Sequence, residues 1–474
     1  MSFFNAHCHT EYSNIRLLDS INKVEDTIDH AAKVGYKGIA LTDHACLSSH
    51  IKGLKHVKQQ KKNNKIPQDF KLVLGEEVYL IDNVRKYKDE YNKETMRYYH
   101  FILLAKDKEG HKQLREISSM AWENSYNQHR MDRVPITYDD IESVVADNPG
   151  HLIASTACLG SFFAQKVLEY NQTKKTATKH EIDQFIKWNI ATFGKENFYI
   201  EIQPSIETPE QQLYNLEAYR IAEAYDLPII VTTDAHYLTK EDREIHKAYL
   251  NSKEGEREVD AFYGSTYLMS TEELAEYLIE NGFNQSQIDT LIQNTMDIYN
   301  KCEEYDLHQD PVVPTFHLPE FELKHLLKDY YNDYEYIHKF SESKHSQDQY
   351  LLYQIEQGLN EKHMSRGRAF TETEVNRINI ELKEIWNISE ILNQRVSAYY
   401  NTMKKIIDIM WRDGDSIVGP ARGSVTGYYI AYLMNITQVN PITWELPYWR
   451  HLTADRPELP KLNWALVVNS LRGV

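Results

Sequence analysis

The sequence is poor in cysteine and has no long apolar run. Its four cysteines (Cys8, Cys46, Cys158 and Cys302) are too scattered along 474 residues for a disulfide scaffold, so we expect reduced thiols and a cytoplasmic location. No run of about 18 apolar residues occurs, which argues against a membrane-spanning helix. The first residues, MSFFNAHCHTEYS, lack the basic start and apolar stretch of a signal peptide.

An excess of basic residues is also absent. Lys and Arg number 53 against 70 Asp and Glu, which gives a net charge of −17. Proteins that coat duplex DNA present a basic face, so this balance argues against extensive duplex binding. It is compatible with a site where metal cations hold a phosphate. The most basic stretch, 56–71, is interpreted as a solvated helix end and loop.

Short apolar runs alternate with helical patterns over the first 240 residues. The runs are 3–7, 37–44, 70–81, 98–105, 151–160, 196–204 and 227–237. Helical spacing occupies 21–36, which closes on Gly35, and also 109–126 and 208–226. This alternation predicts an α/β fold with parallel strands and crossover helices. Beyond 240 the pattern becomes helical, with an extended linker at 310–322 and a Gly-rich turn near 420.

Residues of metal-ligand type stand at or near the ends of the expected strands. His7 and His9 are two apart on the first strand, so both side chains point the same way and can share one ion. The other candidates are Asp19, His44, Glu77, His100, Cys158, Asp234 and His236. Because imidazole, carboxylate and thiolate groups recur at six strand ends, the sequence predicts a metal site.

This pattern resembles the polymerase and histidinol phosphatase (PHP) domain over residues 3–250, in particular the version at the N-terminus of bacterial-type DNA polymerase III alpha subunits. The resemblance implies a distorted (β/α)7-type barrel. It also implies up to three metal ions held by nine ligands: His7, His9, Asp19, His44, Glu77, His100, Cys158, Asp234 and His236. In the family an intact cluster accompanies 3′-to-5′ exonuclease activity, so the implied substrate is a single-stranded primer 3′ end.

The implied chemistry is phosphoester hydrolysis, in which two or more cations hold the phosphate and activate water. The expected catalytic residues are Glu77, His9 and Asp234. Glu77 is the expected bridging ligand, since a carboxylate can bind two ions and an imidazole cannot. Zn²⁺ or Mn²⁺ suits this mixed ligand set.

A second resemblance covers residues 414–460, which look like the start of the palm domain of C-family polymerases. The turn Ala421-Arg422-Gly423-Ser424 stands where the family has Gly-Arg-Gly-Ser, which implies that Arg422, Gly423 and Ser424 bind nucleotide phosphates. We therefore expect a PHP domain at 1–250, a helical segment and linker at 251–322, and the start of the palm at 323–474.

The sequence departs from the family after Pro460. The family places aspartates there that hold catalytic Mg²⁺, whereas this chain has Lys461, Leu462 and Asn463. We therefore do not expect this chain alone to polymerise DNA; Mg²⁺ belongs to a completed polymerase centre. This loss of resemblance suggests a reading frame that runs into unrelated sequence. An interrupted gene, with the rest encoded elsewhere, is the hypothesis, and degeneration of an ancient polymerase is the alternative.

Two other functions stay open. The first is a free-standing PHP phosphoesterase of the histidinol-phosphatase type, which the palm-like segment disfavours. The second is a non-catalytic assembly module braced by metals, which the full ligand set disfavours. The expected partners are DNA, the remaining polymerase segment and other replisome proteins, and not a membrane.

Overall fold

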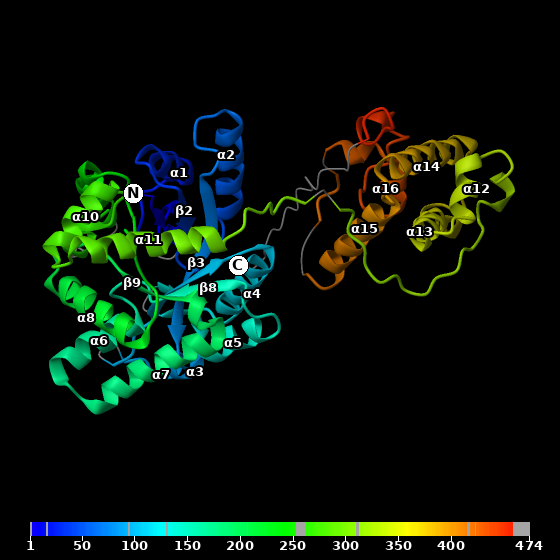
Figure 1. Cartoon of the computed structure of the whole chain (residues 1–474). Helices are drawn as coiled ribbons and strands as arrows, with labels where there is room; N and C mark the ends of the chain where they lie inside the picture. Colours follow the sequence, from blue (N-terminus) through cyan, green and yellow to red (C-terminus); the bar gives the residue numbers. More distant parts are fainter. Residues whose placement is uncertain are drawn as a thin grey trace. The chain divides into compact units, whose positions relative to one another are not determined.

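The computed structural model describes residues 2–15, 18–92, 95–128, 131–205, 207–252, 261–309, 312–414, 418–421 and 423–457. The chain divides into two compact units, Met1–His308 and Gln309–Val474 (Figure 1). This division differs from the sequence-based boundaries at 250 and 322. The reason is that helices α10 (Thr271–Glu280) and α11 (Gln285–Lys301) contribute buried residues to the cores of the first unit.

A nearly closed sheet forms the centre of the first unit. Seven strands follow the order β1-β2-β3-β4-β8-β9-β10, and a bridge between Cys8 and Ala235 joins the segments that follow β1 and β10. The strands are β1 (Phe4–Asn5), β2 (Gly38–Leu41), β3 (Lys71–Ile81), β4 (Tyr99–Ala105), β8 (Leu152–Ser155), β9 (Phe198–Ile202) and β10 (Ile229–Val231). The barrel-like α/β fold expected from the sequence is confirmed.

Helices accompany the barrel strands, as the alternating pattern predicted (Figure 1). Helix α1 ends where Gly35 adopts a φ of +90°, the cap expected from the sequence. The helices between the strands are α1 (Val24–Lys33), α2 (His50–Lys62), α4 (Lys108–Glu123), α5 (Tyr138–Ala146), α6 (Phe162–Thr173), α7 (Thr176–Phe193) and α8 (Pro209–Tyr225).

Alternate strand residues pack on the two faces of the sheet. Phe4, Ala40, Val73, Ile102 and Ile230 belong to the core inside the barrel. Their strand neighbours belong to the larger core beneath the helices, among them Ile39, Leu41, Leu72, Leu74 and Leu103. Because both faces are buried, the strands appear in the sequence as continuous apolar runs rather than as alternating patterns.

The expectation of parallel strands is wrong for β4, which pairs antiparallel with both β3 and β8. The connection from β3 to β4 contains only the short helix α3 (Val84–Asp89) and does not cross the sheet. β4 therefore starts at the same end of the barrel at which β2 and β10 end. The start of β4 carries His100, so this reversal brings His100 to the same end as the other candidate ligands.

Helix α11 closes the other end of the barrel. The Thr295 hydroxyl accepts the N–H of Phe4 at the start of β1, at 3.2 Å. Asn294 donates to the carbonyl of Ile229 at the start of β10, at 2.7 Å. Lys71, which begins β3, donates to the carbonyls of Tyr299 and Cys302. Because α11 binds the starting ends of these strands, it is part of the barrel and not of a separate segment.

Short strands that the sequence patterns did not predict flank the barrel. β7 (Pro135–Thr137) pairs with the end of β3, and β5 (Tyr126–Gln128) pairs with β6 (Met131–Arg133) in a two-stranded ribbon. Three residues are too few for a periodicity to be recognised in the sequence.

The second unit is helical, as predicted for residues 323–412. Its helices are α12 (Glu335–Ser341), α13 (Ser346–Lys362), α14 (Glu372–Leu392), α15 (Ser397–Arg412) and α16 (Tyr429–Leu433). Glu381 of α14 is fully buried and accepts the N–H groups of Tyr429 and Ile430, at 2.7 and 2.8 Å, which fixes the start of α16. No helix in the described part of the chain has the length and apolar character needed to cross a membrane.

Gly75 lies where β3 changes from pairing with β2 to pairing with β4. A Cβ atom at Gly75 would lie 2.7 Å from the carbonyl oxygen of Leu103 on β4. We expect Gly75→Ala to force the two strands apart and to lower the free energy of unfolding by about 1–3 kcal/mol. Urea unfolding measures this change. Gly419→Ala is the control because its Cβ would meet no atom within 4 Å; equal unfolding midpoints for the two variants would contradict the expectation.

Candidate metal centre

Four of the candidate ligands meet around one point at the polar end of the barrel. His7 and His9 lie in the extended segment that follows β1, and their Nε2 atoms are 3.0 Å apart. Both Nε2 atoms lie 3.1 Å from Oδ1 of Asp234, and they lie 2.8 and 3.0 Å from Oε2 of Glu77. Two imidazoles and two carboxylates therefore point at a common centre that one metal ion could occupy.

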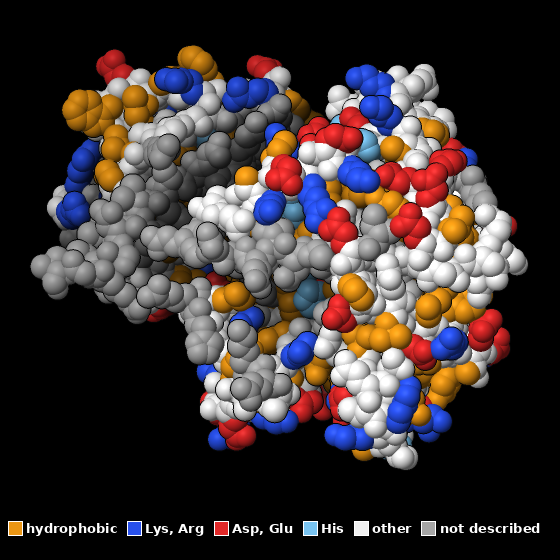
Figure 2. Space-filling model, turned by 90° about the vertical axis from the view of Figure 1, so that its left-hand side faces the viewer, with side chains coloured by type: hydrophobic (Ala, Val, Ile, Leu, Met, Phe, Trp, Pro, Cys, Tyr) orange, Lys and Arg blue, Asp and Glu red, His pale blue; other side chains and the backbone are white. Residues whose placement is uncertain are grey.

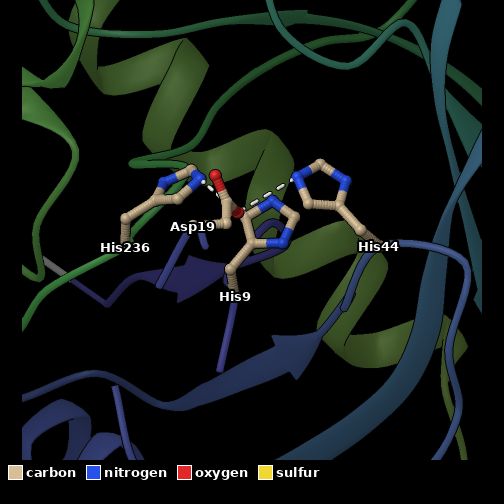
Figure 3. A group of neighbouring side chains, drawn as sticks. All are labelled: His9, Asp19, His44 and His236. Carbon is tan, nitrogen blue, oxygen red and sulfur yellow. Dashed lines mark ion pairs between the residues drawn. The ribbon is translucent and has the colours of Figure 1, made fainter. Parts of the chain in front are cut away.

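A second group consists of His9, Asp19, His44 and His236 (Figure 3). Oδ2 of Asp19 lies 3.2 Å from Nε2 of His44 and 3.1 Å from Nε2 of His236. The rings of His9 and His44 are stacked with centroids 4.2 Å apart. Asp19 comes from the loop after β1, so the chain returns to the barrel rim to complete this group.

The third group consists of His44, Glu77 and His100. Oε1 of Glu77 faces Nδ1 of His100 and lies 3.7 Å from Nδ1 of His44. The Cys158 thiol lies outside the three groups but adjoins this one, because its Sγ is 3.3 Å from Nδ1 of His100. Glu77 lies inside the long strand β3 and not at a strand end, and its two oxygens face different groups, as a bridging carboxylate requires.

Unsatisfied buried atoms indicate that this site is built for cations. Asp19 Oδ2, His44 Nδ1, Glu77 Oε1 and Asp234 Oδ1 are buried without a hydrogen-bond partner in the described part of the chain. Burying polar or charged atoms unpaired is costly, and metal coordination removes that cost. The donors present, imidazole nitrogens and carboxylate oxygens with a thiol beside them, therefore fit divalent metal ions.

The electrostatics of the centre also favour cations. Burial raises the pKa of Glu77, but the nearby His100 and His44 outweigh it and hold the pKa well below its usual range. Burial lowers the pKa of His9, but the adjacent carboxylates of Asp234 and Glu77 outweigh it and raise the pKa to about 10. The carboxylates thus stay ionised, and protons and metal ions compete for the imidazoles.

Sequence reasoning missed Glu201, a fully buried residue on β9. Its carboxylate accepts a hydrogen bond from Nδ1 of His7 at 2.7 Å and from the Thr232 hydroxyl at 2.6 Å. This contact leaves Nε2 of His7 pointing at Asp234 and Glu77, the orientation that a ligand needs. A charged residue in the otherwise apolar run FYIEI was the available signal.

Other polar residues hold the ligands in place. Asp43 accepts hydrogen bonds from the Thr10 amide at 2.7 Å and the Ser13 hydroxyl at 2.8 Å, and Ser13 in turn contacts Nδ1 of His9 at 3.0 Å. Tyr263 donates to Oδ1 of Asp19 at 3.2 Å. Asp43 stands beside His44 in the sequence, whereas nothing in the sequence indicated Tyr263.

The ligands open into a pocket of about 510 Å³. Its lining includes His9, Asp19, His44, Glu77 and Asp234. Asp234 adopts a φ of +44°, a left-handed conformation that is strained for a non-glycine residue and is found mainly at functional sites. The centre is therefore buried on the barrel side and accessible from the other.

Two family models match the chain: "PHP domain" over residues 5–205 and "Bacterial DNA polymerase III alpha NTPase domain" over residues 349–464. Residues 5–205 and residues 349–464 thus resemble two different domain families. The resemblance seen in the sequence is thereby confirmed. Seven of the nine candidate ligands lie within 5–205, and the cluster described above is called the PHP centre below.

Relatives from bacteria and from a phage align with 97% of the chain. "Probable DNA polymerase YorL" of Bacillus subtilis strain 168 and "DNA-directed DNA polymerase" of Bacillus phage SPbeta are both 46% identical to it. "DNA polymerase III subunit alpha" of Aquifex aeolicus is 27% identical. The chain spans 36% of the length of each of these three relatives.

The predicted nucleotide-binding turn lies in the second unit. Gly423 adopts a φ of +70°, and Ser424 begins a short 3-10 helix with its hydroxyl 3.2 Å from Nδ1 of His451. Arg422 lies outside the described residues, as do Lys461 and Asn463.

Replacing Glu201 tests its role in orienting His7. Glu201→Gln keeps the shape of the side chain but removes the charge that holds the His7 proton, so we expect metal affinity to fall about 10–100-fold. Elemental analysis of protein dialysed against graded chelator measures the affinity. Glu196→Gln, at an exposed position outside the site, is the control; equal metal retention by both variants would contradict the orienting role.

Metal removal tests whether the PHP centre contributes to stability. Its ligands come from distant segments and are not prearranged in the unfolded chain, so metal binding favours the folded state by mass action. We expect the midpoint of thermal unfolding to fall on chelation and to recover with Zn²⁺ or Mn²⁺. An unchanged midpoint in protein shown to be metal-free would contradict this expectation.

Proposed function

We propose that this chain is the N-terminal part of a replicative DNA polymerase of the polymerase III alpha type, and that its PHP centre hydrolyses phosphodiester bonds at single-stranded DNA 3′ ends. The observation that carries the proposal is the sharing of ligands between three adjoining groups. Glu77, His9 and His44 each belong to two of them. A structural zinc site needs only four ligands, so this larger set suits catalysis better than bracing alone.

The nine candidate ligands would hold Zn²⁺ or Mn²⁺. When bound, such ions would neutralise a phosphodiester and activate a water molecule. Glu77 joins the groups through its two oxygens, while His9 and Asp234 fix the deep end of the pocket. Glu201 keeps His7 in the orientation that the centre needs.

The second unit supports a nucleic-acid end over a small metabolite as the substrate. Relatives that align with nearly the whole chain are named DNA polymerases. Within this proposal, Arg422, Gly423 and Ser424 bind nucleotide phosphates in the polymerase segment, and Mg²⁺ acts only in a completed polymerase centre. Turnover of histidinol phosphate would favour the alternative function, a free-standing phosphatase.

Asp234→Asn tests the exonuclease. It weakens one ligand in the group that contains His7 and His9 without changing side-chain size, so we expect the rate on a labelled single-stranded oligonucleotide with Mn²⁺ to fall about 100-fold or more. Asp289→Asn, on the exposed side of α11, is the matched control. Equal rates for wild type and Asp234→Asn would assign the activity to a contaminant or another site, and turnover of histidinol phosphate alone would favour the phosphatase.

A further inference from the structure

The pocket above the PHP centre continues into a larger cavity of about 1030 Å³. Four residues line both: Arg97, His100, Cys158 and Gly160. The larger cavity extends from these residues along α6, from Gln165 to Gln172, and reaches Pro209 at the start of α8. The combined space is much larger than a single phosphate ester needs, so a chain molecule can lie in it with one end at the centre.

Arg97 stands at the junction of the two cavities. It lies just before β4, is exposed, and donates a hydrogen bond from Nη1 to Oε1 of Gln165 on α6. In the described part of the chain, no carboxylate forms an ion pair with Arg97. Its charge is therefore available to an anion that passes from one cavity to the other.

Arg133 lines the metal pocket from the β5–β6 ribbon. Its guanidinium lies 4.6 Å from the ring centroid of Tyr98, and that ring is held by a hydrogen bond of 2.5 Å between the hydroxyls of Tyr98 and Tyr126. Nε of Arg133 is buried without a hydrogen-bond partner, and no described carboxylate pairs with the guanidinium. A buried donor without a hydrogen-bond partner costs free energy. An acceptor that enters the pocket and binds this donor would remove that cost.

Two of the three carboxylates that line the larger cavity are paired with other basic side chains. Glu169 pairs with Lys166 at 3.0 Å, and Glu207 pairs with Arg243 through two contacts of 2.7 Å. Glu210 is the remaining carboxylate of the lining. On the face drawn in Figure 2, basic and acidic side chains are interspersed rather than separated.

We propose that Arg97 and Arg133 bind successive phosphates of a polynucleotide strand whose terminal phosphodiester lies at the PHP centre and whose body leaves through the larger cavity. The planar guanidinium group offers paired donors that match phosphate oxygens. Tyr91 and Tyr98 also line the pocket, and aromatic rings stack on bases without regard to sequence. This inference rests on the proposed function and adds that the substrate is a strand of several nucleotides, not a mononucleotide.

Binding of a labelled oligothymidylate tests the two arginines directly. The probe is about eight nucleotides long with hydrolysis-resistant phosphorothioate linkages, and its anisotropy is followed with the full, metal-loaded chain. We expect Arg97→Gln and Arg133→Gln each to weaken binding about tenfold or more. The slope of log affinity against log salt should also fall by about 0.7 for each phosphate that the variant no longer binds.

Arg220→Gln is the matched control, because it removes the same charge as the cavity variants. Arg220 is exposed on α8 and lies outside both cavities. Thermal unfolding midpoints equal to wild type show that the variants fold. If both cavity variants bind the probe as tightly and with the same salt slope as Arg220→Gln, the inference is wrong, whatever the nuclease assay shows.

A comparison of two substrates separates this inference from the proposed function. Wild type and Arg97→Gln are assayed on oligothymidylate and on thymidine 5′-p-nitrophenyl phosphate, which has a single phosphodiester. We expect the loss of kcat/KM on the oligonucleotide to exceed the loss on the small ester by about tenfold, the value of one charge-assisted hydrogen bond. Equal losses would overturn the inference and leave the nuclease standing, whereas a wild type inactive on both substrates would overturn the proposed function.

Discussion

The carboxylate of Glu77 connects the parts of the PHP centre. One oxygen faces His7 and His9, and the other faces His44 and His100, so a single side chain belongs to two ligand groups. This depends on β3, which runs past β2 and then pairs with β4. Gly75 permits the close approach of β4 at that change of partner. The barrel backbone thus determines which imidazoles the two oxygens can reach.

The two ends of the barrel have different roles. At one end, α11 binds the starts of β1, β3 and β10 through ordinary hydrogen bonds and apolar packing. At the other end, polar and charged side chains are buried together, which costs free energy unless cations compensate. The packing at the α11 end offsets the free-energy cost of strain at the ligand end. There, Asp234 holds a left-handed backbone conformation.

The electrostatics of the chain follow from this local concentration of charge. The net charge of −17 gives no general attraction for DNA, and the PHP centre itself is rich in carboxylates. In the proposed function, attraction for a phosphate therefore comes from bound cations and from Arg97 and Arg133, which line the pocket. Stacking on Tyr98 holds the guanidinium of Arg133 while one of its nitrogens stays without a hydrogen-bond partner. Such a group is positioned before any ligand arrives.

The sequence by itself determined the fold class, the helical second unit and the nine candidate ligands, because apolar runs and metal-ligand residue types are local properties of the chain. His7 and His9 are an example, since residues two apart in an extended segment share a face. Only the tertiary structure decided that β4 runs backwards and so delivers His100 from its start, that α11 belongs to the barrel, and that Glu201 orients His7. It alone placed Arg97 and Arg133 in the pocket. These contacts join segments that are far apart in the sequence. Strand direction and packing determine such contacts, and a local residue pattern does not.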